Sequence, residues 1–356
     1  MRMLPELEEL KGLNHLLEDG RLGWMTYETK AVVFERPYEV TVRRFLLSDL
    51  GPTDVLVRTT YSGVSIGTER WVLLNRYKGT IDKFPHIPGY QRVGIVEEVG
   101  SEVAHLKVGD RVFLSSGSCK FIEGQRLHPQ SWNGHVGLSV TDERRAVPLP
   151  ERTKDIEACL AIMAAVGCLG VKMSKVTEGE LVIVIGQGMI GQMSAQAARR
   201  KGATVITSDI VQKRVDLSQR YSADMAINAK EKSLSEVLKE QSKNEADVVI
   251  DTTGIASMFD TCLNLVRHEG RICMQGYYPD PIQIEFHRTH AKRPTVTFPC
   301  AWDHEDLLAM LRAMETGYCI IEPLITHIFS ADKAPEAWKL ILERPEETLG
   351  VALRWE

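Results

Sequence analysis

One stretch in the middle of the chain constrains its fold more than any other. Residues 181–185 form a short apolar run, which indicates a buried strand, and residues 186–191 follow it with the pattern GxGxxG. An alanine-rich, helix-like stretch at 193–201 leads to a second apolar run at 204–207, which ends close to Asp209. Strand, glycine-rich turn, helix, strand and terminal acid in this order predict a βαβ unit that binds a dinucleotide.

The glycines of this turn have separate physical tasks. Gly186 allows the tight turn, Gly188 lets a pyrophosphate approach the backbone, and Gly191 lets the helix pack closely on the strand. The helix N-terminus offers unpaired N–H groups and a positive dipole end to the phosphates. Asp209 would accept hydrogen bonds from both ribose hydroxyls and repel a 2′-phosphate, which favours NAD over NADP. The alternative is a glycine turn in an α/β domain without ligand.

Residues outside the turn extend the predicted cofactor site. Lys213 and Arg214 follow Asp209 and could serve a phosphate, although their surroundings are more typical of a solvent-facing helix. Thr253 lies just after one apolar run and Gly276 just after another, where strands are expected to end. The predicted cofactor-binding residues are Gly186, Gln187, Gly188, Met189, Ile190, Gly191, Asp209, Lys213, Thr253 and Gly276.

Composition narrows the class of protein. The chain has 356 residues, which favours two domains, and a net charge of −5, which argues against nucleic acid or an anionic membrane surface as partner. No apolar run approaches membrane-spanning length, and the N-terminus lacks the basic-then-apolar order of a signal peptide. Its 7 cysteines are scattered without a CxxC pair, so we expect reduced thiols and a cytoplasmic location.

The pattern of apolar and turn residues divides the chain into three parts. Residues 1–29 are expected to be an N-terminal extension with one or two helical turns. From Lys30 to residue 152, apolar runs alternate with turn residues, which predicts a compact, barrel-like β domain. From residue 153 onward, predicted helices alternate with short apolar strands, which is typical of a doubly wound parallel sheet.

Several further stretches carry a resemblance to a known family. They read KAVVFERP, FPHIPGYQRVGIVEEVGSEV, KVGDRVF and WNGHVGLSV before the glycine-rich turn, and DVVIDTTG, EGRICMQG and SADKAPEAWKLI after it. With the turn, they resemble the medium-chain dehydrogenase/reductase superfamily. The resemblance implies an α/β fold: a discontinuous GroES-like β-rich catalytic domain, residues 30–152 and 303–356, with a Rossmann domain, residues 153–302, inserted. It also implies an active site in the interdomain cleft and a homodimer or homotetramer.

The chain departs from the zinc alcohol dehydrogenases wherever this resemblance implies a metal ligand. Ser65 or Ile66 stands in place of the first cysteine, and Tyr90 and Gln91 stand where histidine and glutamate are usual. The third ligand should lie near residues 161–163, none of which coordinates metal. The four closely spaced cysteines of a structural zinc lobe are also missing. We therefore expect neither zinc site.

Without zinc, a side chain must hold or accept the hydroxyl proton during alcohol oxidation. Tyr90 could donate to a carbonyl oxygen, or it could be a packing residue at a strand start. Thr68 resembles the family's proton-relay hydroxyl, and Ser65 could hydrogen-bond substrate, but each could equally serve a turn. Glu69 could be a base, although we favour the interpretation that it forms a structural ion pair with Arg70. His135 could approach the cleft, and its alternative is a structural histidine.

These observations favour one function and leave two alternatives. The pattern GTER with IPGY downstream is similar to a zinc-free branch that includes bacteriochlorophyllide hydroxyethyl dehydrogenases. The prediction is an NAD-dependent, zinc-independent oxidoreductase that interconverts a secondary alcohol and its ketone. Its small-molecule substrate would be a polyol, a cyclitol, a sugar derivative or a hydroxyethyl group on a larger ring. The alternatives are a zinc-free, NADPH-dependent quinone or enoyl reductase and a non-catalytic dinucleotide-binding relative.

Overall fold

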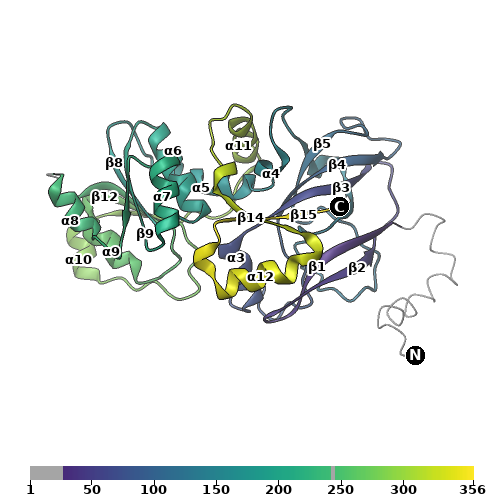
Figure 1. Ribbon diagram of the computed structural model, residues 1–356, viewed down its shortest axis with the longest axis horizontal. Coiled ribbons are helices and arrows are strands. Elements are labelled where there is room, and N and C mark those ends of the chain that lie inside the picture. The colour runs from purple at the N-terminus through teal and green to yellow at the C-terminus, as the bar shows by residue number, and fades with distance from the viewer. Residues whose placement is uncertain (1–26, 242–244) are drawn as a thin grey trace.

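The computed structural model describes residues 27–241 and 245–356, which form a β-rich lobe and a lobe with a parallel sheet (Figure 1). Most of the expected N-terminal extension, residues 1–26, lies outside the described residues. Within the described part of the chain, no helix combines the length and the apolar character needed to cross a membrane.

The β-rich lobe is built around a seven-stranded sheet with the order β14-β15-β3-β4-β5-β7, in which β6 pairs with β3. A separate antiparallel pair, β1 and β2, lies beside it. The strands are β1 (Glu28–Arg36), β2 (Glu39–Leu46), β3 (Asp54–Val64), β4 (Gln91–Val99), β5 (Arg111–Ser115), β6 (Leu138–Asp142), β7 (Ala146–Pro148), β14 (Ile325–Ser330) and β15 (Gly350–Arg354).

Two distant parts of the chain make this sheet. β15 pairs antiparallel with β3, so that Val351 lies opposite Val64, and β14 joins the edge of β15. The C-terminal segment therefore returns to the lobe in which the described chain begins. The exact domain boundaries expected at residues 152/153 and 302/303 stay a prediction, because helix α11 (His304–Glu315) packs against a helix of the other lobe.

The second lobe contains a six-stranded sheet with the order β10-β9-β8-β11-β12-β13, and every pairing in it is parallel. This order reverses direction between β8 and β11, so ligands are expected at the carboxyl ends of those two strands. The strands are β8 (Leu181–Ile185), β9 (Thr204–Asp209), β10 (Met225–Asn228), β11 (Ala246–Asp251), β12 (Val266–Met274) and β13 (Thr295–Thr297). The predicted α/β class with a doubly wound parallel sheet is confirmed.

Helices cover both faces of the parallel sheet, which explains why β8 is buried along its whole length (Figure 1). One face packs on α8 and α9, and the other packs on α5 and α6. The helices are α3 (Ile66–Leu73), α4 (Asp155–Ala158), α5 (Ala161–Met173), α6 (Met189–Arg200), α7 (Gln212–Tyr221), α8 (Leu234–Glu240), α9 (Met258–Leu265), α10 (Phe286–Lys292), α11 (His304–Glu315) and α12 (Ala334–Glu343).

One hydrophobic cluster joins the two lobes. It combines Met163 of α5, Met189 of α6 and Leu311 of α11 with Val93 of β4 and Ala352 of β15. Since all five side chains are almost fully buried in one cluster, they hold the two lobes together beneath the cleft that the next section describes.

Candidate functional site

A cleft of about 910 Å³ lies where the two lobes meet. Its lining comes from the start of α3 in the β-rich lobe, the start of α6 and the loops after β11 and β12 in the other lobe. The turn before β15 adds Pro345, Thr348 and Leu349. The cleft therefore includes the carboxyl ends of β8 and β11, where the sheet topology predicts a ligand.

The glycine-rich turn has the backbone geometry that a dinucleotide requires. Gly186 adopts φ +85°, a backbone conformation that would be strained in a residue with a side chain. A Cβ at Gly191 would lie 1.9 Å from the Gly186 carbonyl oxygen, whereas a Cβ at Gly188 would meet nothing within 4 Å. The open backbone at Gly188 lines the cleft at the N-terminus of α6. This cradle fits the pyrophosphate of a dinucleotide.

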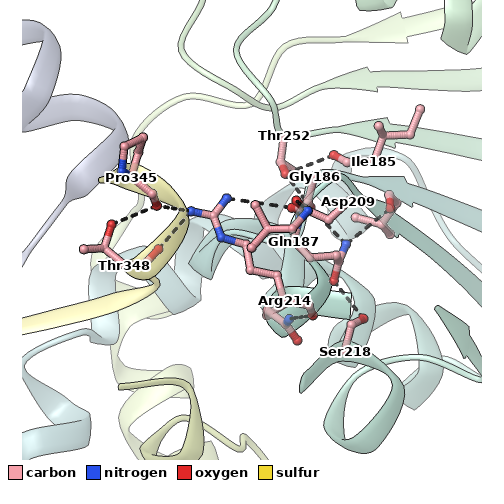
Figure 2. Close-up of polar contacts among 12 residues, drawn as sticks. Ile185, Gly186, Gln187, Asp209, Arg214, Ser218, Thr252, Pro345 and Thr348 are labelled. Atoms are coloured by element: carbon pink, nitrogen blue, oxygen red, sulfur yellow. Dashed lines mark hydrogen bonds and ion pairs between the residues drawn. The ribbon is translucent and has the colours of Figure 1, made fainter. Parts of the chain in front are cut away.

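Asp209 is held against the same turn. Its carboxylate accepts hydrogen bonds from the backbone N–H groups of Gln187 at 2.6 Å and Val211 at 2.9 Å (Figure 2). The Gln187 side chain lies below the turn, where its oxygen accepts a hydrogen bond from Ser218 at 2.9 Å. Both the side chain and the backbone N–H of Gln187 are therefore bonded within the protein, and the carboxylate of Asp209 is fixed at the end of β9.

Two arginines line the cleft beside this turn. Arg214 donates to the carbonyl oxygens of Pro345 at 2.7 Å and Thr348 at 2.9 Å and lies 3.8 Å from the Asp209 carboxylate (Figure 2). Arg70 has no acceptor or carboxylate partner among the described residues, and its Nε is buried. Burial and the charge of Arg214 lower the pKa of Arg70. A cation in this position is suited to an anionic ligand.

Three hydroxyl groups meet on the opposite side of the cleft. The phenol of Tyr90 donates a hydrogen bond to Ser65 Oγ at 2.6 Å. Burial, together with the Glu69 carboxylate, raises the pKa of Tyr90, and hydrogen bonds with Ser65 and Thr68 offset part of this rise. Tyr90, Ser65 and Thr68 all line the cleft. The structure thus brings three of the predicted catalytic residues together.

Glu69 and His135 lie below this group and are fully buried, so neither lines the cleft. Glu69 accepts a hydrogen bond from the Ser65 backbone at 2.8 Å and contacts His135 Nε2 at 2.9 Å. His135 Nδ1 lies 2.8 Å from Ser62 Oγ, which also accepts a hydrogen bond from the Trp355 indole. The pair positions Ser65 from beneath. The favoured ion pair between Glu69 and its neighbour Arg70 is wrong, because His135 takes the carboxylate and Arg70 points into the cleft.

The metal-ligand positions do not fit zinc. Ile66 and Met163 bring apolar side chains to the cleft, and Gln91 Oε1 accepts the backbone N–H of Ile162 at 3.1 Å. Within residues 27–241 and 245–356, no group of three or more His, Cys, Asp or Glu side chains is arranged to hold a metal ion. A phenol, an amide that is already bonded and two apolar side chains do not make a zinc site.

The predicted cofactor residues differ in whether they line the cleft. Gly188, Met189, Ile190, Thr253 and Gly276 line the cleft. Gly186, Gly191, Gln187 and Asp209 support the turn from behind, and Lys213 does not line the cleft, whereas its neighbour Arg214 does. Sequence reasoning considered Arg70 only as a partner of Glu69 and missed its place in the cleft.

Family matches agree with this architecture. The family described as Alcohol dehydrogenase GroES-like domain matches residues 51–151, and the family described as Zinc-binding dehydrogenase matches residues 190–316. These two domain families follow each other along one chain and correspond to the two lobes. The chain belongs to the medium-chain dehydrogenase/reductase superfamily. The expected GroES-like domain is confirmed, while membership of a zinc-free branch of the superfamily stays a prediction.

Relatives within the superfamily cover nearly the whole chain. An L-threonine 3-dehydrogenase of Vibrio cholerae is 25% identical over 87% of this chain and 94% of its own length. An Escherichia coli CFT073 alcohol dehydrogenase complexed with NADH superposes with a TM-score of 0.80 at 20% identity, over 92% of this chain and 99% of that one. A Sinorhizobium meliloti protein bound to NADP superposes with a TM-score of 0.79 at 22% identity, over 92% of this chain and 99% of that one. At these identities the solved structures establish the fold.

Proposed function

We propose that this protein is an NAD-dependent oxidoreductase that interconverts a secondary alcohol and its ketone by hydride transfer, without a catalytic metal. One observation carries the proposal. The hydrogen-bonded hydroxyls of Tyr90 and Ser65 open into the cleft that also contains the glycine-rich turn, and Tyr90 occupies a position where zinc enzymes of the superfamily have a ligand. A threonine dehydrogenase and an alcohol dehydrogenase complexed with NADH among its relatives support this reaction class.

The choice of NAD rests on the end of β9. Asp209 presents a carboxylate beside the turn, where a 2′-phosphate would be repelled. Arg214 could offset this repulsion, but its guanidinium is already bonded to the carbonyls of Pro345 and Thr348. These contacts support NAD, while relatives with NADH and with NADP both occur.

A bound nicotinamide would accept a hydride from the carbinol carbon or return it to the carbonyl carbon. Tyr90 serves the proton side of the reaction. In reduction, its hydroxyl donates to the carbonyl oxygen as the hydride reaches the carbon, so the C=O π pair and the proton form the product O–H bond. Ser65, 2.6 Å from the phenol oxygen, passes a replacement proton from cleft water to Tyr90.

The raised pKa of Tyr90 determines the expected pH dependence. The phenol keeps its proton through neutral pH, so it is a donor for carbonyl reduction there. Oxidation needs the alcohol proton to leave through the same phenol, and a deprotonated phenol becomes more populated as pH rises. We therefore expect the rate of oxidation to increase with pH above neutrality, and the rate of reduction to decrease at high pH.

Calorimetric titration with NADH and NADPH, with the metal content of the same sample determined, tests the proposal. Tighter binding of NADH without stoichiometric zinc is the expected result. A preference for NADPH would instead favour the reduction of an activated double bond, and stoichiometric zinc would contradict metal-independent chemistry. Binding of neither dinucleotide would refute the proposal altogether.

The proposal also includes an oligomeric state and a location in the cell. The superfamily resemblance supports a homodimer or homotetramer. The cysteines, which are scattered along the chain without a CxxC pair, support a cytoplasmic location. Light scattering coupled to size exclusion measures the first, since a monomeric mass at micromolar concentration would contradict it. Fractionation of the producing cells measures the second.

A further inference from the structure

Aromatic rings form a continuous wall along the cleft. Tyr277 stacks on Tyr77 with ring centroids 4.5 Å apart, and Tyr77 meets the edge of Trp132 at 5.6 Å. The ring centroids of Trp132 and Tyr90 are 6.0 Å apart, and Tyr90 stacks on Trp302 with ring centroids 5.7 Å apart. Each of these five residues lines the cleft and is half-buried. We call Tyr77, Tyr90, Trp132, Tyr277 and Trp302 the aromatic wall.

Contacts between the lobes hold the aromatic wall in place. Tyr277 accepts a hydrogen bond from the Lys78 backbone at 2.9 Å, and Arg76 forms a 2.9 Å ion pair with Asp280. These contacts join the segment after α3 to the loop after β12. The rings are therefore arranged before any substrate arrives, and binding does not need to order them.

The aromatic wall passes through the proposed reaction centre. Tyr90 lies between Trp132 and Trp302 in the wall, and its hydroxyl is the proposed proton donor. A flat group that packs on either tryptophan would place an attached carbonyl close to the Tyr90 hydroxyl. The rings are thus positioned to select the group bonded to the reacting carbon.

The carboxylate and amide side chains that line the described part of the cleft already have partners. Among the described residues that line the cleft there is no His, Asn or Glu. Asp280 is paired with Arg76, and Gln275 is bonded to Ser194 Oγ at 3.0 Å. A polyol packed on the aromatic wall would leave the hydroxyls that face the rings unpaired on burial, which is costly. The faces of the aromatic wall therefore favour an apolar ring instead.

We infer that the substrate carries a flat, apolar aryl or conjugated ring next to its carbinol or carbonyl carbon. The inference rests on the proposed function and narrows its substrate class, because it ranks aryl and conjugated substrates above polyols, cyclitols and sugars. Aromatic contacts add to the binding that comes from buried area alone. We expect them to give a preference of about tenfold for a planar ring over a saturated ring of the same size.

A matched pair of substrates tests this inference in the full-length protein. Acetophenone and cyclohexyl methyl ketone share the methyl ketone and differ in the flatness and π-system of the ring. With NADH, we expect kcat/KM to be about tenfold higher for acetophenone, and dihydroxyacetone to be a poor substrate. Equal values for the pair, or a preference for dihydroxyacetone, would overturn the inference.

Variants of the wall assign the effect to its rings. Trp132→Leu and Trp302→Leu should each reduce the ratio of the two kcat/KM values toward one, mainly through KM for acetophenone. Trp132→Phe keeps a ring and should retain most of the ratio. Phe286→Leu is the matched control, because Phe286 is an aromatic residue with 75% exposure outside the cleft. A ratio that survives both leucine variants would also overturn the inference.

A failure of the proposed function can be distinguished from a failure of this inference. If NADH binds but no ketone is reduced, the proposed reaction is wrong, and the ring preference is then measured by binding alone. Calorimetric titration of the NADH complex with 1-phenylethanol and 1-cyclohexylethanol gives that preference without turnover. Tighter binding of 1-phenylethanol, lost in Trp132→Leu, supports the aromatic wall as a ring site, and equal affinities reject it.

Discussion

Replacement of Arg70 by leucine should weaken cofactor binding without weakening the fold. In the free protein, the guanidinium of Arg70 is half-buried and has no acceptor among the described residues, and burial together with the charge of Arg214 lowers its pKa. Its removal relieves this repulsion, so the free energy of unfolding should stay the same or rise slightly. Because Arg70 lines the cleft beside the N-terminus of α6, its expected partner is the cofactor pyrophosphate.

The size of the binding effect follows from the missing contact. A hydrogen bond to a charged group contributes about 1.5–3 kcal/mol, which corresponds to an increase of about 10- to 150-fold in the Kd for NADH. Calorimetry measures the Kd, and urea unfolding of the free protein measures stability. The matched control is Arg220→Leu, since Arg220 stacks on the next residue, Tyr221, as Arg70 stacks on Trp71, but lies outside the cleft.

The control should leave the Kd for NADH within about twofold, because an exposed charge far from the ligand is screened. An Arg70→Leu protein that binds NADH as tightly as the parent would refute the assignment. A large loss of stability would refute it as well, because it would mean that Arg70 has a structural partner in the free protein.

Two further predictions concern the turn and the pH dependence of stability. Gly191→Ala should abolish NADH binding in calorimetry, because its Cβ would lie 1.9 Å from the Gly186 carbonyl oxygen; an unchanged Kd would contradict the close packing described for this turn. Burial, with smaller contributions from His128 and Lys83, lowers the pKa of His86 to about 4, so its contribution of about 3 kcal/mol is present above pH 6.5 and is lost as pH falls toward 4. Burial raises the pKa of Asp251 to about 6, so its similar contribution is present below pH 3.8 and is lost as pH rises through 6. Urea unfolding between pH 4 and 6.5 measures both effects. On acidification, the free energy of unfolding should rise in His86→Phe, and it should fall more steeply in Asp251→Asn than in the parent. Identical pH profiles of the three proteins would contradict both assignments.

The fold was predictable where the sequence signals are local. The order of strand, glycine-rich turn, helix and strand is contained in one segment, and the structure shows β8, α6 and β9 in that order. The helix starts at Met189, earlier than the alanine-rich stretch suggests, because the glycine-rich turn itself provides its first turn. The helical segment before the glycine-rich turn is divided into α4 and α5, since the chain leaves helical geometry at Leu160.

The site was less predictable where its contacts join distant residues. Tyr90, Ser65 and Thr68 were found because a family pattern aligns them with known positions. The partner of Glu69 was not, because His135 is far away in sequence and becomes its neighbour only when the β-rich lobe folds. The aromatic wall likewise joins residues from both lobes, and no local pattern marks them as one surface.

Steady-state kinetics of the chelator-treated protein and its Tyr90→Phe variant test the central claim most directly. We predict that the metal-free parent reduces a ketone with NADH, and that Tyr90→Phe reduces kcat by about 10²–10⁴ while the Kd for NADH stays unchanged. Full activity in Tyr90→Phe, or activity that appears only when zinc is restored, would contradict the claim that this phenol takes the place of the metal.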